Sequence, residues 1–248
     1  MVLSIVDKGV SLVDSARDEG LILRLLGAVA FQIHCPKFRY LSEKMQRTLT
    51  DIDFAAYGKQ RQGIVQFFKK NKVPQLHEDI TALLPRMIYQ DPSGLTIDVF
   101  LDRLEMCHTI NFTGRLETDQ WTVPLAELLL EKLQIVRINE KDIKDVIMLL
   151  REHELGQGDK EVINSGYITE LLSADWGFYH TVELNLRKID AVILNHNALT
   201  DEDRQDVHAK IDSLLQTMEG TPKSLRWKIR AKVGESQKWY TDVEEVVS

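Results

Sequence analysis

Apolar and polar side chains follow one another along the chain with periods that predict helices first and strands next. Residues 3 to 18 carry charged side chains between apolar ones at the 3.6-residue period of an amphipathic helix. The predicted apolar stripe of this helix consists of Leu3, Val6, Val10 and Val13. A second apolar run is interrupted at Gly27 and then continues, which predicts a short strand, a tight glycine turn and a helix.

Period-two alternation marks two further strands. Residues 50–57 alternate polar and apolar side chains, so Asp51 and Asp53 fall on one face of a half-buried strand. The turn sequence at residues 91–94 predicts a hairpin, and its second strand places Asp98 in mid-strand among apolar neighbours. One face of that strand carries Thr96, Asp98, Phe100 and Asp102, and the other carries Ile97, Val99 and Leu101. Between these strands we expect a basic loop at residues 35–47 and an amphipathic helix at residues 60–72.

Beyond residue 116 the pattern becomes almost entirely helical. Pro124 suits the first turn of a helix that continues with the apolar segment 125–136. Further helices are expected at residues 142–150, 160–172, 176–194, 201–218 and 224–233. We therefore predict an α+β fold, with a small mixed β-sheet flanked by helices in residues 1–118 and an all-helical region in residues 119–248.

Composition and charge narrow the functional classes. The 248 residues are 44% hydrophobic and 28% charged, as expected for a globular protein, and the net charge of −7 provides no global attraction to nucleic acid or anionic membranes. Two cysteines, Cys35 and Cys107, are too few for a disulfide framework and lack zinc-site spacing. No signal-peptide pattern or membrane-spanning apolar run occurs. We expect a soluble cytoplasmic protein that does not contact membranes.

Three carboxylates occupy strand positions where an isolated buried charge is costly. Asp51 and Asp53 lie two residues apart on one strand, and Asp98 lies on a neighbouring strand. Such carboxylates can bind Mg²⁺, which takes oxygen ligands and completes its shell with water and substrate phosphates. The alternative is that Asp51 or Asp53 merely faces solvent on an open sheet. The glycine turn at Gly27, which opens a helix, and the basic segment that ends at Arg47 favour a phosphate ligand.

These residues resemble the motifs of the nucleotidyltransferase superfamily of the DNA polymerase β type, over roughly residues 20 to 150. The matching segments are Leu26-Gly27-Ala28, Asp51-Ile52-Asp53 and Ile97-Asp98-Val99. The segment 123–150 is similar to the helical part of the compact bacterial abortive-infection toxin nucleotidyltransferases. Its matching positions are Lys132, Arg137, Lys141, Asp142 and Asp145. The family has Gly or Ser where this chain has Ala28, so a phosphate-binding hydroxyl is missing and only the backbone N–H remains.

The resemblance implies a fold, a reaction and roles for single residues. It implies Mg²⁺-dependent transfer of a nucleotidyl group from an NTP to an acceptor, either an RNA such as tRNA or a protein. Asp51, Asp53 and Asp98 would be catalytic and hold the metal. Nucleotide-binding residues would be Gly27, Ala28, Arg47 and Lys132. The toxin resemblance also implies an antitoxin-like protein partner.

Several features keep other interpretations open. Ala28 favours a catalytically silent nucleotide-binding or protein-interaction module on the same fold. Lys132 on an amphipathic helix would more commonly extend to solvent, and Asp142 and Asp145 would commonly lie on a solvated helix face. His34 and His108 have no partner at metal-ligand spacing. The segment 222–240 interleaves basic and aromatic residues, which is typical either of nucleic-acid contact or of a packed helix with solvated lysines.

Overall fold

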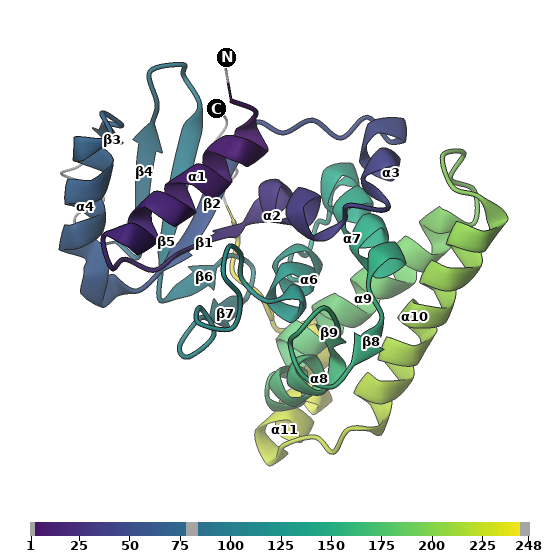
Figure 1. Cartoon of the computed structure of the whole chain (residues 1–248). Helices are drawn as coiled ribbons and strands as arrows, with labels where there is room; N and C mark the ends of the chain where they lie inside the picture. The colour runs from purple at the N-terminus through teal and green to yellow at the C-terminus, as the bar shows by residue number, and fades with distance from the viewer. Residues whose placement is uncertain (1–2, 78–83, 244–248) are drawn as a thin grey trace. The chain divides into compact units, whose positions relative to one another are not determined.

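The computed structural model describes residues 3–77 and 84–243 of the chain. These residues form two compact units (Figure 1). Unit 1 comprises Met1–Pro36, Thr48–Leu104 and Ile110–Pro124. Unit 2 comprises Lys37–Arg47, Glu105–Thr109 and Leu125–Ser248. The sequence-based division after residue 118 stays a prediction.

Unit 1 contains a five-stranded mixed sheet with the strand order β1-β2-β5-β4-β3. The strands are β1 Leu23–Leu26, β2 Asp51–Ala56, β3 Gln75–Leu76, β4 Arg86–Gln90 and β5 Thr96–Leu101. The neighbours β2 and β5 run parallel, whereas every other adjacent pair in this sheet is antiparallel. The predicted small mixed sheet is therefore confirmed, and β2 and β5 lie side by side within it (Figure 1).

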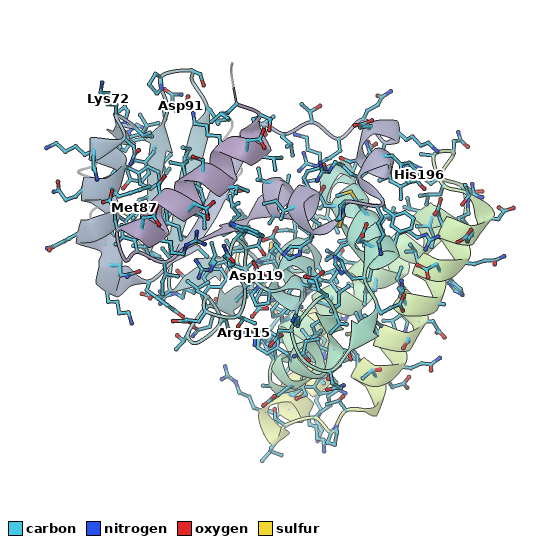
Figure 2. The ribbon with its side chains drawn as sticks, in the orientation of Figure 1. Lys72, Met87, Asp91, Arg115, Asp119 and His196 are labelled. Carbon is cyan, nitrogen blue, oxygen red and sulfur yellow. The ribbon has the colours of Figure 1, made fainter. Side chains whose placement is uncertain are left out.

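The hairpin of β4 and β5 forms around the predicted turn. Gly94 adopts φ +88°, a conformation that favours glycine. The buried carboxylate of Asp91 accepts hydrogen bonds from the backbone N–H groups of Ser93 and Leu95, both at 2.8 Å, and pairs with Lys8. Figure 2 labels Asp91 at this turn. All residues of β5 except Thr96 are buried, so both of its faces are covered.

Helix α1 (Ile5–Asp18) forms within the predicted range 3–18, with Ser4 as its N-cap, but its buried face is shifted from the predicted stripe and shares only Val13 with it. Its buried residues are Gly9, Leu12, Val13 and Ala16, whereas Leu3 is 59% exposed. The reason is the close approach at Gly9, where an added Cβ would lie 2.9 Å from Leu25 Cδ2. Unit 1 also contains α2 Gly27–His34, the 3₁₀ turn η1 Gly58–Gln60 and α4 Arg61–Lys70.

Unit 2 is largely helical, in agreement with the prediction. Its helices are α3 Arg39–Lys44, α6 Leu125–Leu133, α7 Glu140–Glu152, α8 Ser165–Ala174, α9 Trp176–Ile193, α10 Asp201–Gly220, α11 Leu225–Val233 and the 3₁₀ turn η2 Gly234–Ser236. Unit 2 also contains the two-stranded sheet of β8 Leu155–Gly156 and β9 Ile163–Asn164, whereas β6 Arg103–Glu105 and β7 Thr109–Asn111 form a second two-stranded sheet, most of whose residues belong to unit 1. Among the described residues, every helix is too short or too polar to cross a lipid bilayer.

Two local predictions for unit 2 were wrong. The segment predicted as a basic loop contains α3, whose start is held by Glu152 Oε2 as it accepts the backbone N–H groups of Lys37 and Phe38 at 3.0 and 2.9 Å. The helix predicted from residue 160 begins only at Ser165. Residues 163–164 pair with β8 instead, and the Asn164 side chain caps the helix by accepting the N–H of Tyr167.

The histidines that the sequence offered as candidates are packed within their own units. His34 Nε2 contacts the hydroxyl of Thr122 in unit 1. His108 is buried in unit 2, where its Nε2 lies 2.8 Å from Thr181 Oγ1 and its ring stacks on Phe178 with centroids 4.8 Å apart. Burial lowers the pKa of His108 to about 4, although the charge of Asp175 partly offsets this effect. His108 is therefore neutral in the folded protein at physiological pH.

The depressed pKa of His108 predicts a loss of stability in acid. In the unfolded chain the His108 imidazole binds a proton near pH 6.5, whereas in the folded protein it does so only near pH 4. The free energy of unfolding therefore falls as the pH drops from 6.5 to 4. The shift corresponds to about 3 kcal/mol. We expect urea titrations to show that the free energy of unfolding decreases less between pH 7 and pH 4.5 for His108→Gln than for the wild type. Equal losses would contradict this prediction.

Candidate nucleotide and metal site

The candidate site in unit 1 starts at the turn between β1 and α2. Gly27 has φ +68°, and α2 begins at this residue. A Cβ atom added at Gly27 would overlap Asp53 Oδ2 and would lie 3.1 Å from Asp53 Cγ. Only glycine therefore permits both the left-handed backbone and the approach of the carboxylate. The backbone N–H groups at the start of α2 are consequently close to an acidic side chain on β2.

The parallel pairing of β2 with β5 brings two of the three predicted carboxylates together. Asp53 is the register partner of Asp98, and Asp51 pairs with Thr96. Because side chains alternate along a strand, Asp51 and Asp53 share a face, and both are partly exposed while Ile52 between them is buried. Asp98 is 7% exposed. The sequence argument placed Asp98 on a neighbouring strand, and the register places it directly beside Asp53.

A cation that the sequence reasoning missed binds Asp98, one member of this carboxylate pair. Arg86 on β4 makes a bidentate ion pair with Asp98, with Nη2–Oδ2 at 2.8 Å and Nε–Oδ1 at 3.1 Å. Burial disfavours the charge of Arg86, but hydrogen bonding to Asp98 and the charges of Asp98 and Asp53 outweigh burial and raise its pKa above the ordinary value. Its guanidinium also lies 5.3 Å from the ring centroid of Phe100. Arg86 thus neutralises part of the acidic charge of the site.

The carboxylates at this position provide only part of the ligand shell that Mg²⁺ needs. Within the described ranges, no group of three or more His, Cys, Asp or Glu side chains lies close enough together to hold a metal ion. Mg²⁺ is commonly held by one or two carboxylates, with water and substrate phosphates as the remaining ligands. Asp51 and Asp53 on one face of β2 fit that requirement. Asp98 fits it only when its oxygens are shared with, or released by, Arg86.

The remaining predicted nucleotide-binding residues are divided between the two units. Ala28 is the second residue of α2, is 6% exposed and offers no hydroxyl. Arg47 and Lys132 belong to unit 2, where they surround one buried carboxylate, Asp145. Arg47 binds Asp145 in a bidentate pair at 3.0 and 3.1 Å. Their assignment to the nucleotide stays a prediction.

Lys132 lies in a cluster of acidic side chains instead of extending to solvent. Its Nζ is 3.4 Å from Asp142 Oδ1 and 3.5 Å from both Glu131 Oε1 and Asp145 Oδ2. The Lys132 side chain is 12% exposed. The other two cations of the resembling segment, Arg137 and Lys141, are exposed. The structure therefore groups Lys132, Asp142 and Asp145 with Arg47, and it leaves Arg137 and Lys141 outside that group.

No family model matches the chain, and no curated protein matches it significantly. One similar solved structure is the solution structure of the antibiotic-resistance factor ANT(2'')-Ia, with 12% sequence identity and a TM-score of 0.40. The match covers 57% of this chain and 80% of that one. A likeness of this size leaves the function to be argued from the residues themselves.

Proposed function

We propose that this protein is a nucleotidyltransferase that moves a nucleotidyl group from an NTP to an acceptor hydroxyl with the help of Mg²⁺. The observation that carries the proposal is the register pairing of Asp53 with Asp98 on adjacent parallel strands, with Asp53 packed against the Gly27 turn. Carboxylates beside the start of a helix suit a metal–phosphate ligand, because the helix N–H groups complement phosphate oxygens. Asp51 adds a second carboxylate on the same face as Asp53.

Each residue has a role in the proposed reaction. Bound Mg²⁺ would neutralise phosphate charge and orient the triphosphate. Asp51 and Asp53 would hold this ion, and the N–H groups at Gly27 and Ala28 would bind phosphate oxygens. Arg86 would provide positive charge beside the triphosphate once Asp98 is released. Asp98 would then accept the proton of the acceptor hydroxyl. At the same time the hydroxyl oxygen would bond to the α-phosphorus of the NTP, and the bond from that phosphorus to pyrophosphate would break.

Transfer of a radiolabelled α-phosphate tests the proposal directly. Purified protein is incubated with Mg²⁺, each of the four labelled NTPs, and either total cellular RNA or total cellular protein. We expect label on one acceptor class with the wild type and none with Asp51→Ala/Asp53→Ala, because the metal ligands are removed. The matched control, Asp18→Ala/Glu43→Ala, removes two exposed carboxylates and should keep full activity.

The same experiment separates the proposed enzyme from a non-catalytic nucleotide-binding module. Ala28 supports the second possibility, because a buried alanine cannot donate a hydroxyl to a phosphate. A binding module would show a rise in melting temperature with an NTP, lost in Asp51→Ala/Asp53→Ala, without transfer of label. If no label is transferred and no NTP stabilises the protein against heat, the proposal as a whole is contradicted.

A further inference from the structure

Helix α11 exposes an aliphatic stripe on its surface. Leu225, Ile229 and Val233 follow one another at four-residue spacing and are 75%, 58% and 36% exposed. No residue of this helix is buried. Single exposed apolar residues are ordinary, whereas a contiguous stripe marks an interaction surface. The structure thus includes an apolar helix face that its own packing does not use.

The stripe forms one wall of a groove. A cavity of about 600 Å³ lies between α11 and the junction of α8 with α9. Its second wall includes Trp176, Gly177 and Trp239. This volume is within the range of about 300–1,000 Å³ that is common for ligand pockets and accommodates large apolar side chains. The groove therefore has a concave shape and a lining in which apolar surface exceeds polar surface.

Specific contacts hold both walls of the groove in place. Ser224 caps α11 by accepting the N–H of Trp227. Arg230 donates hydrogen bonds at 2.7 Å to the carbonyl groups of Gly234 and Gln237, which ties the segment after α11 to the helix. Trp239 Nε1 donates to Thr181 Oγ1 on α9 at 3.0 Å. The groove is preformed, which reduces the entropy cost of binding a partner.

The charged residues that line the groove are Arg226, Arg230 and Asp175, and α11 adds two further exposed cations, on a protein whose net charge is −7. Arg226, Lys228 and Lys232 are exposed on α11, and the helix contains no acidic residue. No ion pair joins any of the three to another residue within the part of the chain that the structure describes. Electrostatic complementarity therefore favours a partner with acidic side chains beside its apolar ones.

The aromatic rings do not form a stacking platform for nucleotide bases. His180 stacks on Trp176 with centroids 4.8 Å apart, and the Arg230 guanidinium lies 4.7 Å from the same ring. Trp239 contacts Trp176 and His180 edge to face. Bases stack on open aromatic faces, whereas the exposed apolar surface here is aliphatic. These contacts favour a protein partner over single-stranded nucleic acid.

We propose that the groove beside α11 binds an acidic amphipathic helix of a partner protein. The partner helix would place apolar side chains in the cavity and along the stripe of Leu225, Ile229 and Val233. Its carboxylates would face Arg226, Lys228 and Lys232. This is the helix-in-groove mode, in which apolar anchors at three- and four-residue spacing enter a preformed groove. The proposal stands independently of nucleotidyl transfer, because no residue of the candidate site in unit 1 takes part.

Selection from a displayed library of random peptides of about 16 residues, long enough for an isolated helix, tests this inference. The full-length wild-type protein is the target, and Ile229→Asp is the counter-target. We expect enriched peptides to combine Asp or Glu with apolar residues at helical spacing. Synthetic copies should bind Ile229→Asp and Arg226→Glu about tenfold or more weakly than the wild type. Leu184→Asp, a matched change of an exposed leucine on α9, should bind as the wild type does.

Circular dichroism and melting temperature establish that each variant remains folded, so that a loss of binding reports on the groove. Three results would overturn the inference. The first is no enrichment on the wild type. The second is enrichment of peptides whose binding is unchanged by Ile229→Asp. The third is tight binding of a single-stranded oligonucleotide that Ile229→Asp abolishes, which would assign the groove to nucleic acid.

Discussion

Gly27→Ala is expected to lower the proposed nucleotidyl transfer on the order of a hundredfold while the protein stays folded. The alanine Cβ would occupy the position of the Asp53 carboxylate and would force it away from the start of α2. The left-handed backbone at φ +68° adds a cost of roughly 1–2 kcal/mol for a residue with a Cβ. We would measure transfer of labelled α-phosphate, the NTP-dependent rise in melting temperature and the stability in urea.

Gly20→Ala provides the matched control for this substitution. Gly20 has φ +75°, but an added Cβ would meet no atom within 4 Å. Both variants should therefore lose similar stability from backbone strain, whereas only Gly27→Ala should lose activity and NTP binding. Equal activity in the two variants would show that the contact of Gly27 with Asp53 is unimportant for the site.

Asp145→Ala is expected to reduce the free energy of unfolding of unit 2 by about 3–5 kcal/mol. The Asp145 side chain is 1% exposed and neutralises Arg47, which is itself 8% exposed. Lys132 lies 3.5 Å from the same carboxylate. Removing the Asp145 carboxylate leaves the buried Arg47 guanidinium without its bidentate partner, which costs more free energy than the loss of an exposed pair. Urea denaturation followed by circular dichroism measures the change.

The matched control is Glu140→Ala on the same helix. Glu140 pairs with Lys144 at 2.6 Å, but its side chain is 79% exposed, and exposed pairs contribute little to stability. We expect this variant to unfold at nearly the wild-type urea concentration. Comparable destabilisation of both variants would refute the view that burial makes Asp145 important.

Elements defined by neighbouring residues were predictable from the sequence. The alternation around Asp51 and Asp53 gave β2, and the turn at residues 91–94 gave the hairpin, because both depend on local periodicity and backbone preference. Helix α3 was missed because its start is held by Glu152, which lies more than 100 residues further along the chain. The buried face of α1 was missed because Gly9 allows a close approach that apolar spacing does not reveal.

The candidate site was predictable in part for the same reason. Gly27, Asp51 and Asp53 lie in short motifs, so their chemistry is visible in the sequence. Whether they bind nucleotide stays a prediction. The pairing of Arg86 with Asp98 depends on the register of β4 with β5, in which Ile88 faces Asp98 and Arg86 lies diagonally from it. A hairpin prediction with its register fixed by the turn could have placed this cation beside Asp98.

The two units consist of alternating segments of the chain, which affects the order in which the protein can fold during synthesis. All segments of unit 1 lie within the first 124 residues, whereas α3 of unit 2 precedes most of them. Arg47 leaves the ribosome 98 residues before Asp145. At about 5–20 residues per second, this delay is roughly 5–20 s. The sheet of unit 1 can therefore form before α7, the packing partner of α3 in unit 2, has been synthesised.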